Sequence, residues 1–203
     1  MMSKVREVFE KEGEAIRNIP VTESFEAATQ LIYRQVHEKG GKLVSVGMGK
    51  AGEIANNIST TFSSTGTPAV FLHPSDAQHG DLGVIQPDDV LLLVSNSGKT
   101  REILELIELA SRLYNHLPMI AITSKAESEL AIAADVCILT GDPDEVCPLG
   151  LSPTTSTTVM TVIGDALIVL QMEKIGFTSD DYAKRHHGGY LGGKSREQAK
   201  AKA

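Results

Sequence analysis

Three hydroxyl side chains around a glycine, in the segment SNSGKT, are the residues best suited to bind a ligand. Ser95, Ser97 and Thr100 follow the apolar run VLLLV and precede a pattern of helical spacing. Backbone N–H groups at the start of a helix lack intrahelical acceptors and carry partial positive charge, so they bind phosphate well. One hydroxyl alone would most simply cap the helix, but three on one turn favour a phosphate site. We expect this site to use Ser95, Asn96, Ser97, Gly98 and Thr100.

A second hydroxyl cluster, PTTSTT at 153–158, opens a long, mostly apolar segment that ends near residue 175. Helix capping with close packing of small residues is one interpretation of it, and substrate binding is the other. The sequence leaves both open. The candidates for binding are Thr154, Thr155 and Ser156.

Ionisable side chains stand beside glycines and predicted strand ends, where parallel sheets hold their ligands. A carboxylate or an imidazole there could move a proton next to a carbonyl group, and a lysine could steady the charge that develops. Each such residue alone is more typical of an ordinary surface. No close spacing indicates a metal site, and no G-x-S-x-G elbow indicates acyl transfer. The candidates are Lys50, His79, Glu102, Glu145 and His186, with His187 beside the last.

Two glycine motifs imitate nucleotide-binding sites. GMGKAG at 47–52 matches the dinucleotide pattern, but the next predicted strand ends in Leu72-His73-Pro74 and lacks the acid that would hold a ribose. SGKT at 97–100 imitates a P-loop, but the earlier glycine that the motif requires is Leu93. We therefore expect neither NAD nor a nucleoside triphosphate as cofactor, and no cofactor of another kind.

The hydrophobic pattern indicates an α/β fold. Apolar runs alternate with segments of helical spacing, which predicts a parallel sheet covered on both faces. The N-terminal segment 3–38 is predicted as two helices broken at Asn18-Ile19-Pro20. The tail 177–193 is polar and glycine-rich and is expected to belong to the active site, partly buried between subunits, and the end 194–203 is expected to be solvated. The chain should form one domain with its α/β core at 41–176. Strands are expected at 43–49, 69–73, 90–95, 119–123 and 136–139, and helices at 50–64, 100–113, 126–133 and 154–175.

Composition narrows the function classes. The 203 residues carry a formal charge of −7, which argues against a general nucleic-acid or membrane-surface binder. We expect no signal peptide and no membrane span, and therefore a soluble cytoplasmic protein. The cysteines Cys137 and Cys147 have apolar neighbours and are expected to be buried thiols.

Several motifs together resemble a known family. From about residue 41 to 193 the chain is similar to the sugar isomerase (SIS) domain of D-arabinose 5-phosphate isomerases. That resemblance implies a three-layer αβα sandwich with a five-stranded parallel sheet, and a homotetramer with sites between subunits. The motifs, in chain order, are GMGKAG (47–52), STGTP (64–68), HPSDAQHGDLG (73–83), SNSG (95–98), EVCPLGLSPTTSTT (145–158), GDA (164–166) and HHGGYLGG (186–193).

The resemblance also implies roles. The family's lysine falls on Lys50, its histidines on His79 and His186, and its glutamates on Glu102 and Glu145; Gly49, Ser95, Ser97 and Thr100 fall among its substrate-binding positions. Isomerisation of D-ribulose 5-phosphate to D-arabinose 5-phosphate would pass through an enediol. Lys50 would steady substrate oxygens, a glutamate would shuttle the proton, and a histidine would open the cyclic sugar. Glu145 is slightly preferred over Glu102 because it stands in a loop shaped by proline and glycine.

Three departures from the family pattern qualify these assignments. Lys99 stands where relatives often have an acid, and His187 replaces a proline after His186. The chain is also expected to lack the pair of cystathionine-β-synthase-type domains that many relatives carry. Another isomerase, acting on a hexulose or sedoheptulose phosphate, and a non-catalytic sugar-phosphate sensor remain as alternatives. The resemblance suggests supply of 3-deoxy-D-manno-octulosonate (Kdo) for lipopolysaccharide or capsule, with CMP-Kdo as a candidate feedback ligand.

Overall fold

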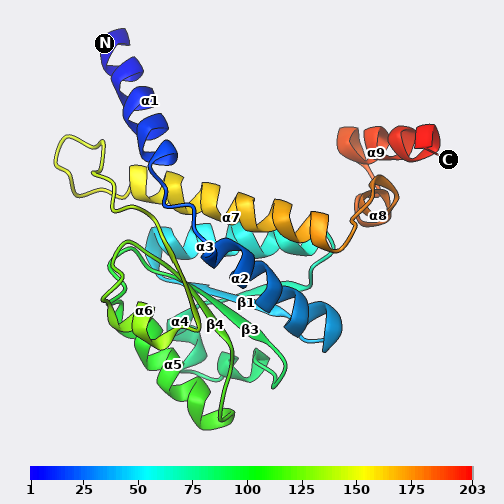
Figure 1. The fold of residues 1–203 in the computed structure, drawn as a ribbon, viewed down its shortest axis with the longest axis horizontal. Coiled ribbons are helices and arrows are strands. Elements are labelled where there is room, and N and C mark those ends of the chain that lie inside the picture. Colours follow the sequence, from blue (N-terminus) through cyan, green and yellow to red (C-terminus); the bar gives the residue numbers. More distant parts are fainter. Residues whose placement is uncertain (203) are drawn as a thin grey trace.

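A five-stranded, all-parallel sheet forms the centre of the molecule and lies between two layers of helices (Figure 1). The computed structural model describes residues 1–202. The strand order is β2-β1-β3-β4-β5. The predicted fold class, an αβα sandwich with five parallel strands, is confirmed. The strands are β1 (Leu43–Gly47), β2 (Ala69–Leu72), β3 (Val90–Val94), β4 (Met119–Thr123) and β5 (Val136–Leu139).

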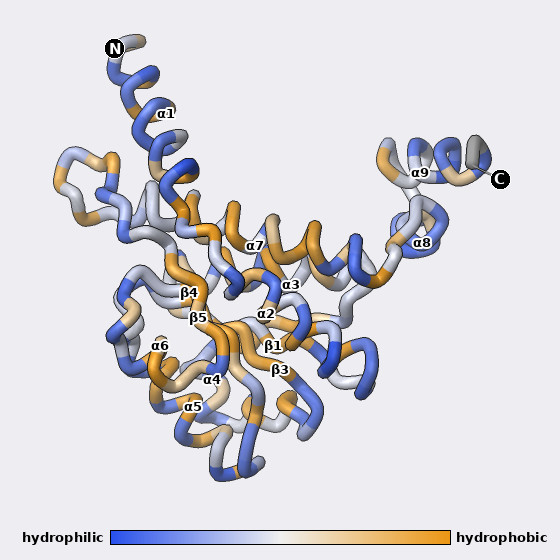
Figure 2. Tube along the Cα trace, viewed as in Figure 1, coloured by the Kyte–Doolittle hydropathy of each residue, from blue (hydrophilic) through white to orange (hydrophobic). Residues whose placement is uncertain are grey.

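The central strand shows why its sequence is apolar at every position. Val90, Leu92 and Val94 pack into one hydrophobic cluster, whereas Leu91 and Leu93 pack into the other. Side chains alternate between the faces of a strand, so a strand covered on both faces needs apolar residues throughout. Figure 2 shows this apolar centre in the sheet, with hydrophilic colour on the outer turns.

One face of the sheet is covered by α2 (Ser24–Ile32), α3 (Gly49–Ser64) and α7 (Thr155–Lys174). The last turns after α2 are π-helical, in η1 (Tyr33–Glu38), and α1 (Met2–Arg17) crosses the first part of α7. The other face is covered by α4 (Pro74–Ala77), the 3₁₀-helix η2 (Asp81–Val84), α5 (Arg101–Leu113) and α6 (Glu129–Ala133).

Helix α7 is long and apolar enough to cross a membrane by length and composition alone. Half of its most apolar window is buried inside the molecule, where it packs against α1, α2 and α3. Gly164 allows the closest part of this packing, because a Cβ there would lie 2.5 Å from a side-chain carbon of Ile58 on α3. The apolar character of α7 therefore fits that of a core helix.

The C-terminal segment, for which the sequence indicated only a polar, glycine-rich tail and a solvated end, is helical. Residues 179–202 form two helices, α8 (Ser179–Arg185) and α9 (Gly189–Lys202), which pack against each other beyond the end of α7 (Figure 1). A capping box starts α8, in which the side chains of Thr178 and Asp181 each accept the other's backbone N–H. The expected boundary between residues 193 and 194 falls inside α9, and Ser195 is buried.

Candidate active site

The site is built where the strand order reverses. β1 lies between β2 and β3, so the chain leaves β1 towards α3 on one face and leaves β3 towards α5 on the other. Open α/β sheets hold ligands in the crevice outside the carboxyl ends of such neighbouring strands. Gly47 is the register partner of Val94, which brings the start of α3 beside the loop that begins at Ser95.

The loop 95–100 turns its hydroxyls towards one another. The Oγ of Ser95 lies 2.7 Å from Oγ1 of Thr100, and it also accepts the backbone N–H of Gly98 at 3.2 Å. Gly98 has a φ of +62°, a left-handed conformation that favours glycine. A Cβ at Gly98 would also lie 2.0 Å from the Ser128 hydroxyl, so the tight turn excludes any side chain there.

Helix capping does not account for the hydroxyls of this loop. Thr100 is the N-cap residue of α5, yet its side chain makes no capping hydrogen bond. Within residues 1–202, the backbone N–H groups of Ser97, Thr100 and Arg101 donate to no protein acceptor. These N–H groups at a helix start are available to an anion.

The glycines of GMGKAG serve mainly to bring α3 close to β1. A Cβ on Gly47 would lie 2.7 Å from the Ala51 carbonyl oxygen, and a Cβ on Gly52 would lie 2.7 Å from the Gly47 carbonyl oxygen. Gly49 has a φ of +57° and begins the helix. Lys50 follows in the first turn with an exposed side chain, next to the loop after β3.

Glu102 lies in the first turn of α5, directly after the hydroxyl loop, and is half-buried. Within the described residues it makes no side-chain hydrogen bond and no ion pair. His79 is exposed on the segment that follows α4. The neighbouring Gln78 donates a 2.8 Å hydrogen bond to Glu105 on α5, one turn beyond Glu102, so His79 lies near the same helix.

Glu145 is held at the start of α7. Its carboxylate accepts the backbone N–H of Thr154 at 2.6 Å and the Thr154 hydroxyl at 2.8 Å, and Ser156 adds its hydroxyl and its N–H. Burial raises the pKa of this carboxyl group, but the four hydrogen bonds outweigh that effect and hold the pKa below its ordinary value.

The second hydroxyl cluster points inwards in this structure. Thr154 and Ser156 bind Glu145, and the hydroxyl of Thr155 accepts the N–H of Val146 at 3.2 Å. These hydroxyls anchor the loop 145–146, whereas Thr154, the N-cap residue of α7, makes no side-chain capping hydrogen bond. A direct contact of these three residues with substrate stays a prediction.

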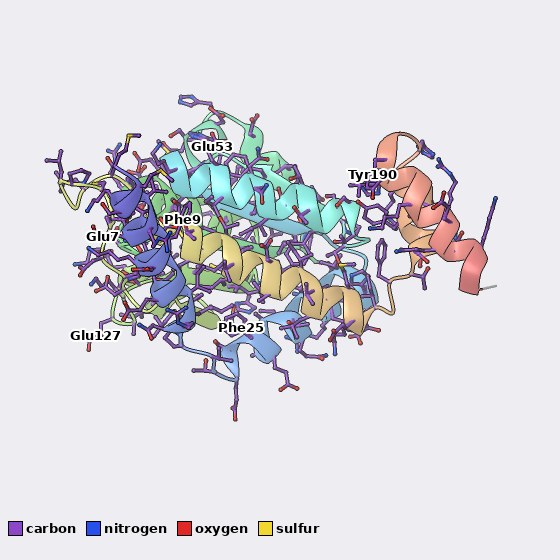
Figure 3. The ribbon with its side chains drawn as sticks, turned by 90° about the horizontal axis from the view of Figure 1, so that it is seen from above. Glu7, Phe9, Phe25, Glu53, Glu127 and Tyr190 are labelled. Atoms are coloured by element: carbon purple, nitrogen blue, oxygen red, sulfur yellow. The ribbon has the colours of Figure 1, made fainter. Side chains whose placement is uncertain are left out.

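His186 is not brought together with the other candidates within one chain. Its ring stacks on Tyr182 with 3.8 Å between centroids, in the connection between α8 and α9. Glu145 lies at one end of α7 and His186 beyond the other end, and 20 residues at about 1.5 Å each place about 30 Å between those ends. Figure 3 shows α1 over the first part of α7 and the α8–α9 pair at its far end.

Sequence reasoning missed several neighbours of the hydroxyl loop. Thr123 and Ser124, at the end of β4, donate hydrogen bonds to the carbonyl of Asn96, and Lys125 pairs with Asp142 after β5. A threonine and a serine at the carboxyl end of a predicted strand were the available signal. Lys99 has an exposed side chain and no ion pair within the described residues.

The two thiols that were expected to be buried, Cys137 and Cys147, are both only partly buried. Cys147 lies in a loop whose neighbouring residues 148–150 are exposed. Its sulfur accepts the backbone N–H groups of Ser152 and Leu151, both at 3.2 Å, and these bonds lower its pKa. Cys137, on β5, is partly buried against the apolar cluster, which raises its pKa.

Comparison with known proteins agrees with this geometry. Residues 36–170 match the SIS domain. The chain belongs to the SIS-domain family. The SIS fold thus accounts for the sheet order and for the resemblance that the motifs indicated.

Two relatives match more than 90% of this chain. The arabinose 5-phosphate isomerase KdsD of Yersinia pestis is 48% identical over 185 residues, which are 91% of this chain and 55% of that protein. The chain therefore spans about half the length of this curated relative. The crystal structure of a proposed phosphosugar isomerase involved in capsule formation, from Bacteroides fragilis, is 60% identical with a TM-score of 0.92 and covers 94% of this chain and 99% of that one.

A third similar protein was solved with a ligand. A protein of Escherichia coli CFT073, solved in complex with arabinose 5-phosphate, is 35% identical with a TM-score of 0.80. The alignment covers 89% of this chain and 94% of that one.

Proposed function

We propose that this SIS domain interconverts D-ribulose 5-phosphate and D-arabinose 5-phosphate. The observation that carries the proposal is the hydroxyl loop 95–100, whose Ser97 and Thr100 N–H groups meet no protein acceptor within the described residues. Lys50 and Glu102 lie on the two helices that begin beside it. The names of the relatives support the substrate, because KdsD proteins are arabinose 5-phosphate isomerases and the Escherichia coli protein binds arabinose 5-phosphate. No observation favours a hexulose phosphate, a sedoheptulose phosphate or a non-catalytic sensor.

In the proposed mechanism the loop 95–100 anchors the phosphate, and the sugar extends over the crevice between β1 and β3. A carboxylate removes a proton from C1 of the ketose, which gives an enediol, and the proton returns to C2 to give the aldose. Lys50 stabilises the negative charge that develops on the substrate oxygens. His79 and His186 are the proposed groups for opening the cyclic aldose.

The two glutamates differ in their readiness to act as the base. Four hydrogen bonds lower the pKa of Glu145, which weakens it as a base near neutral pH. Glu102 makes no such bonds within the described residues and lies in the first turn after the phosphate loop. The geometry of this chain therefore favours Glu102 as the base and gives Glu145 the task of ordering the start of α7, which reverses the preference from sequence.

The proposed assembly is a homotetramer in which a neighbouring subunit supplies His186. Glu145 lies at one end of α7 and His186 beyond the other, and the length of about 30 Å between those ends supports a site that draws His186 from another subunit. An apolar groove of about 1230 Å³ between α2 and α7, lined by residues such as Phe25, Val162 and Val169, offers a subunit contact. Val169 is 53% exposed, which is unusual for the middle of an apolar helix.

The proposed setting is the cytoplasm, where the product would supply Kdo synthesis for lipopolysaccharide or capsule. The capsule connection printed for the Bacteroides fragilis relative supports this pathway. Feedback would then act at the active site itself, and CMP-Kdo is the proposed ligand, since it is an anionic sugar nucleotide that the same crevice could take.

A turnover experiment tests the function. Purified protein is incubated with D-ribulose 5-phosphate in deuterated water, and proton NMR follows both the aldose product and deuterium at C2. We expect D-arabinose 5-phosphate to form with deuterium at C2. Hexulose and sedoheptulose phosphates serve as parallel substrates. Faster turnover of one of these would replace the proposed substrate, and binding without any turnover would show a sensor.

A further inference from the structure

The backbone carbonyl of Asn96, in the hydroxyl loop, is held by three donors from the end of β4. The N–H of Ser124 donates to it at 3.0 Å, the Ser124 hydroxyl at 2.9 Å and the Thr123 hydroxyl at 3.1 Å. One carbonyl oxygen has two lone pairs, so three donors leave no room for a fourth partner.

The direction of this carbonyl fixes the direction of the next N–H. A trans peptide is planar, and its C=O and N–H point to opposite sides. Because the Asn96 carbonyl is drawn towards β4, the N–H of Ser97 is turned away from β4. That N–H meets no protein acceptor within the described residues, which is the orientation that an anion in the loop requires.

The same side of the loop rests on the start of α6. The N–H of Leu130 donates to the Gly98 carbonyl at 3.1 Å, and Gly98 lies so close to Ser128 that no Cβ fits between them. Ser128 is itself fixed as the N-cap of α6, accepting the N–H of Ala131. The rigid element beneath the hydroxyl loop is therefore the β4–α6 connection.

We infer that Thr123 and Ser124 are positioning residues that preset the Ser97 N–H for the substrate phosphate, an inference that rests on the proposed function for the identity of that substrate. Neither hydroxyl is needed to bind the phosphate directly. Their removal leaves the Ser95, Ser97 and Thr100 hydroxyls in place but leaves the Asn96 carbonyl with the Ser124 N–H as its one donor within the described residues, so the Asn96–Ser97 peptide is held less firmly. The loss is then in affinity for the phosphate group and not in the chemical step.

The test compares Ser124→Ala and Thr123→Val with Thr123→Ser, which keeps the hydroxyl. The matched control is Ser111→Ala, because Ser111 makes an exposed hydrogen bond of the same kind at the far end of α5. Steady-state kinetics with D-arabinose 5-phosphate give KM and kcat, and the dissociation constant of inorganic phosphate is measured by NMR titration. Far-UV circular dichroism and a urea midpoint show whether each variant is folded.

We expect Ser124→Ala and Thr123→Val each to raise KM and the phosphate dissociation constant by the same factor, about two- to tenfold, the worth of one hydrogen bond. The kcat should stay within about twofold, and Thr123→Ser and Ser111→Ala should match the unmutated protein. An unchanged phosphate dissociation constant in folded variants, or a fall in kcat at constant KM, overturns the inference.

The phosphate titration separates this inference from the proposed function. If the unmutated protein binds phosphate but turns over no sugar phosphate, the isomerase proposal fails, and the phosphate constants of the variants still decide the positioning role. If the protein turns over its substrate and Ser124→Ala changes no constant, the positioning role alone fails.

Discussion

The carboxylate of Glu145 lies 2.6 Å from the backbone nitrogen of Thr154, and this bond ties the loop after β5 to the first turn of α7. The same carboxylate also accepts hydrogen bonds from Ser156. An acidic group at a helix start is favoured by the partial positive charge there. Glu145 therefore links the end of the sheet to the longest helix of the molecule.

The first prediction concerns stability against pH. Because the folded-state pKa of Glu145 lies below its ordinary value of 4.5, its contribution is present above pH 4.5 and is lost as pH falls through the folded value. Glu145→Gln should lower the urea midpoint near neutral pH. The difference from the unmutated protein should shrink as the pH is lowered below 4.5.

Glu53→Gln is the control for this measurement, since Glu53 is exposed on the outside of α3 and makes no ion pair within the described residues. Its urea midpoint should follow that of the unmutated protein at every pH. A constant difference between Glu145→Gln and the unmutated protein across the acid range would show that Glu145 contributes through packing and not through its charge.

The second prediction concerns the phosphate loop. Ser95→Ala combined with Ser97→Ala should raise KM for the sugar phosphate at least about 100-fold, because hydrogen bonds to a charged group contribute about 1.5–3 kcal/mol each. Ser97→Thr keeps a hydroxyl and should retain most of the affinity. The measurement is steady-state kinetics. D-Arabinose, which has no phosphate group, is included as a competitor. An unchanged KM in a folded double variant would show that the phosphate does not bind at this loop.

Much of the fold followed from local pattern. The strands 119–123 and 136–139 were predicted with the bounds that the structure shows, because buried parallel strands are continuous apolar runs. The glycines in HHGGYLGG concealed α9, since glycine is a poor helix former and gives no apolar period. That helix forms by packing against α8, a tertiary contact that local propensity does not contain.

The site was predictable only in part. Ser95, Ser97 and Thr100 share one turn, so their proximity was visible in the sequence. The bonds that hold Glu145 were not, because capping and substrate binding by PTTSTT require the same residue types. The support of the Asn96 carbonyl joins residues 28 positions apart, a distance at which no local pattern operates.

The third prediction concerns assembly and His186. If a neighbouring subunit supplies this side chain, His186→Asn and Glu102→Gln will each be inactive alone but will restore activity when mixed within one oligomer. When equal amounts mix at random, about a quarter of all sites should be intact, because each site draws the two residues from different chains. Co-expression with two affinity tags gives the mixed species, and light scattering reports its size.

A mixed oligomer without activity would place both residues in one site from a single chain. A monomer at micromolar concentration would contradict the assembly itself. His187→Asn serves as the matched control, since His187 is exposed beside His186 and its ring makes no hydrogen bond within the described residues. It should keep the activity of the unmutated protein.

The last prediction decides which carboxylate is the base. Glu102→Gln keeps the shape of the side chain but removes the basic oxygen, so turnover should fall by about 100- to 10,000-fold while substrate still binds. Exchange of the C1 proton of ribulose 5-phosphate with deuterated water should fall in parallel, since the enediol no longer forms. Glu145→Gln should lower turnover less than Glu102→Gln, because its main effect is to loosen the start of α7. If Glu145→Gln abolishes exchange and Glu102→Gln does not, substrate binding must release Glu145 from Thr154 and Ser156, and Glu145 is the base. If neither change stops exchange, a histidine removes the proton, and His79→Asn and His186→Asn identify which one.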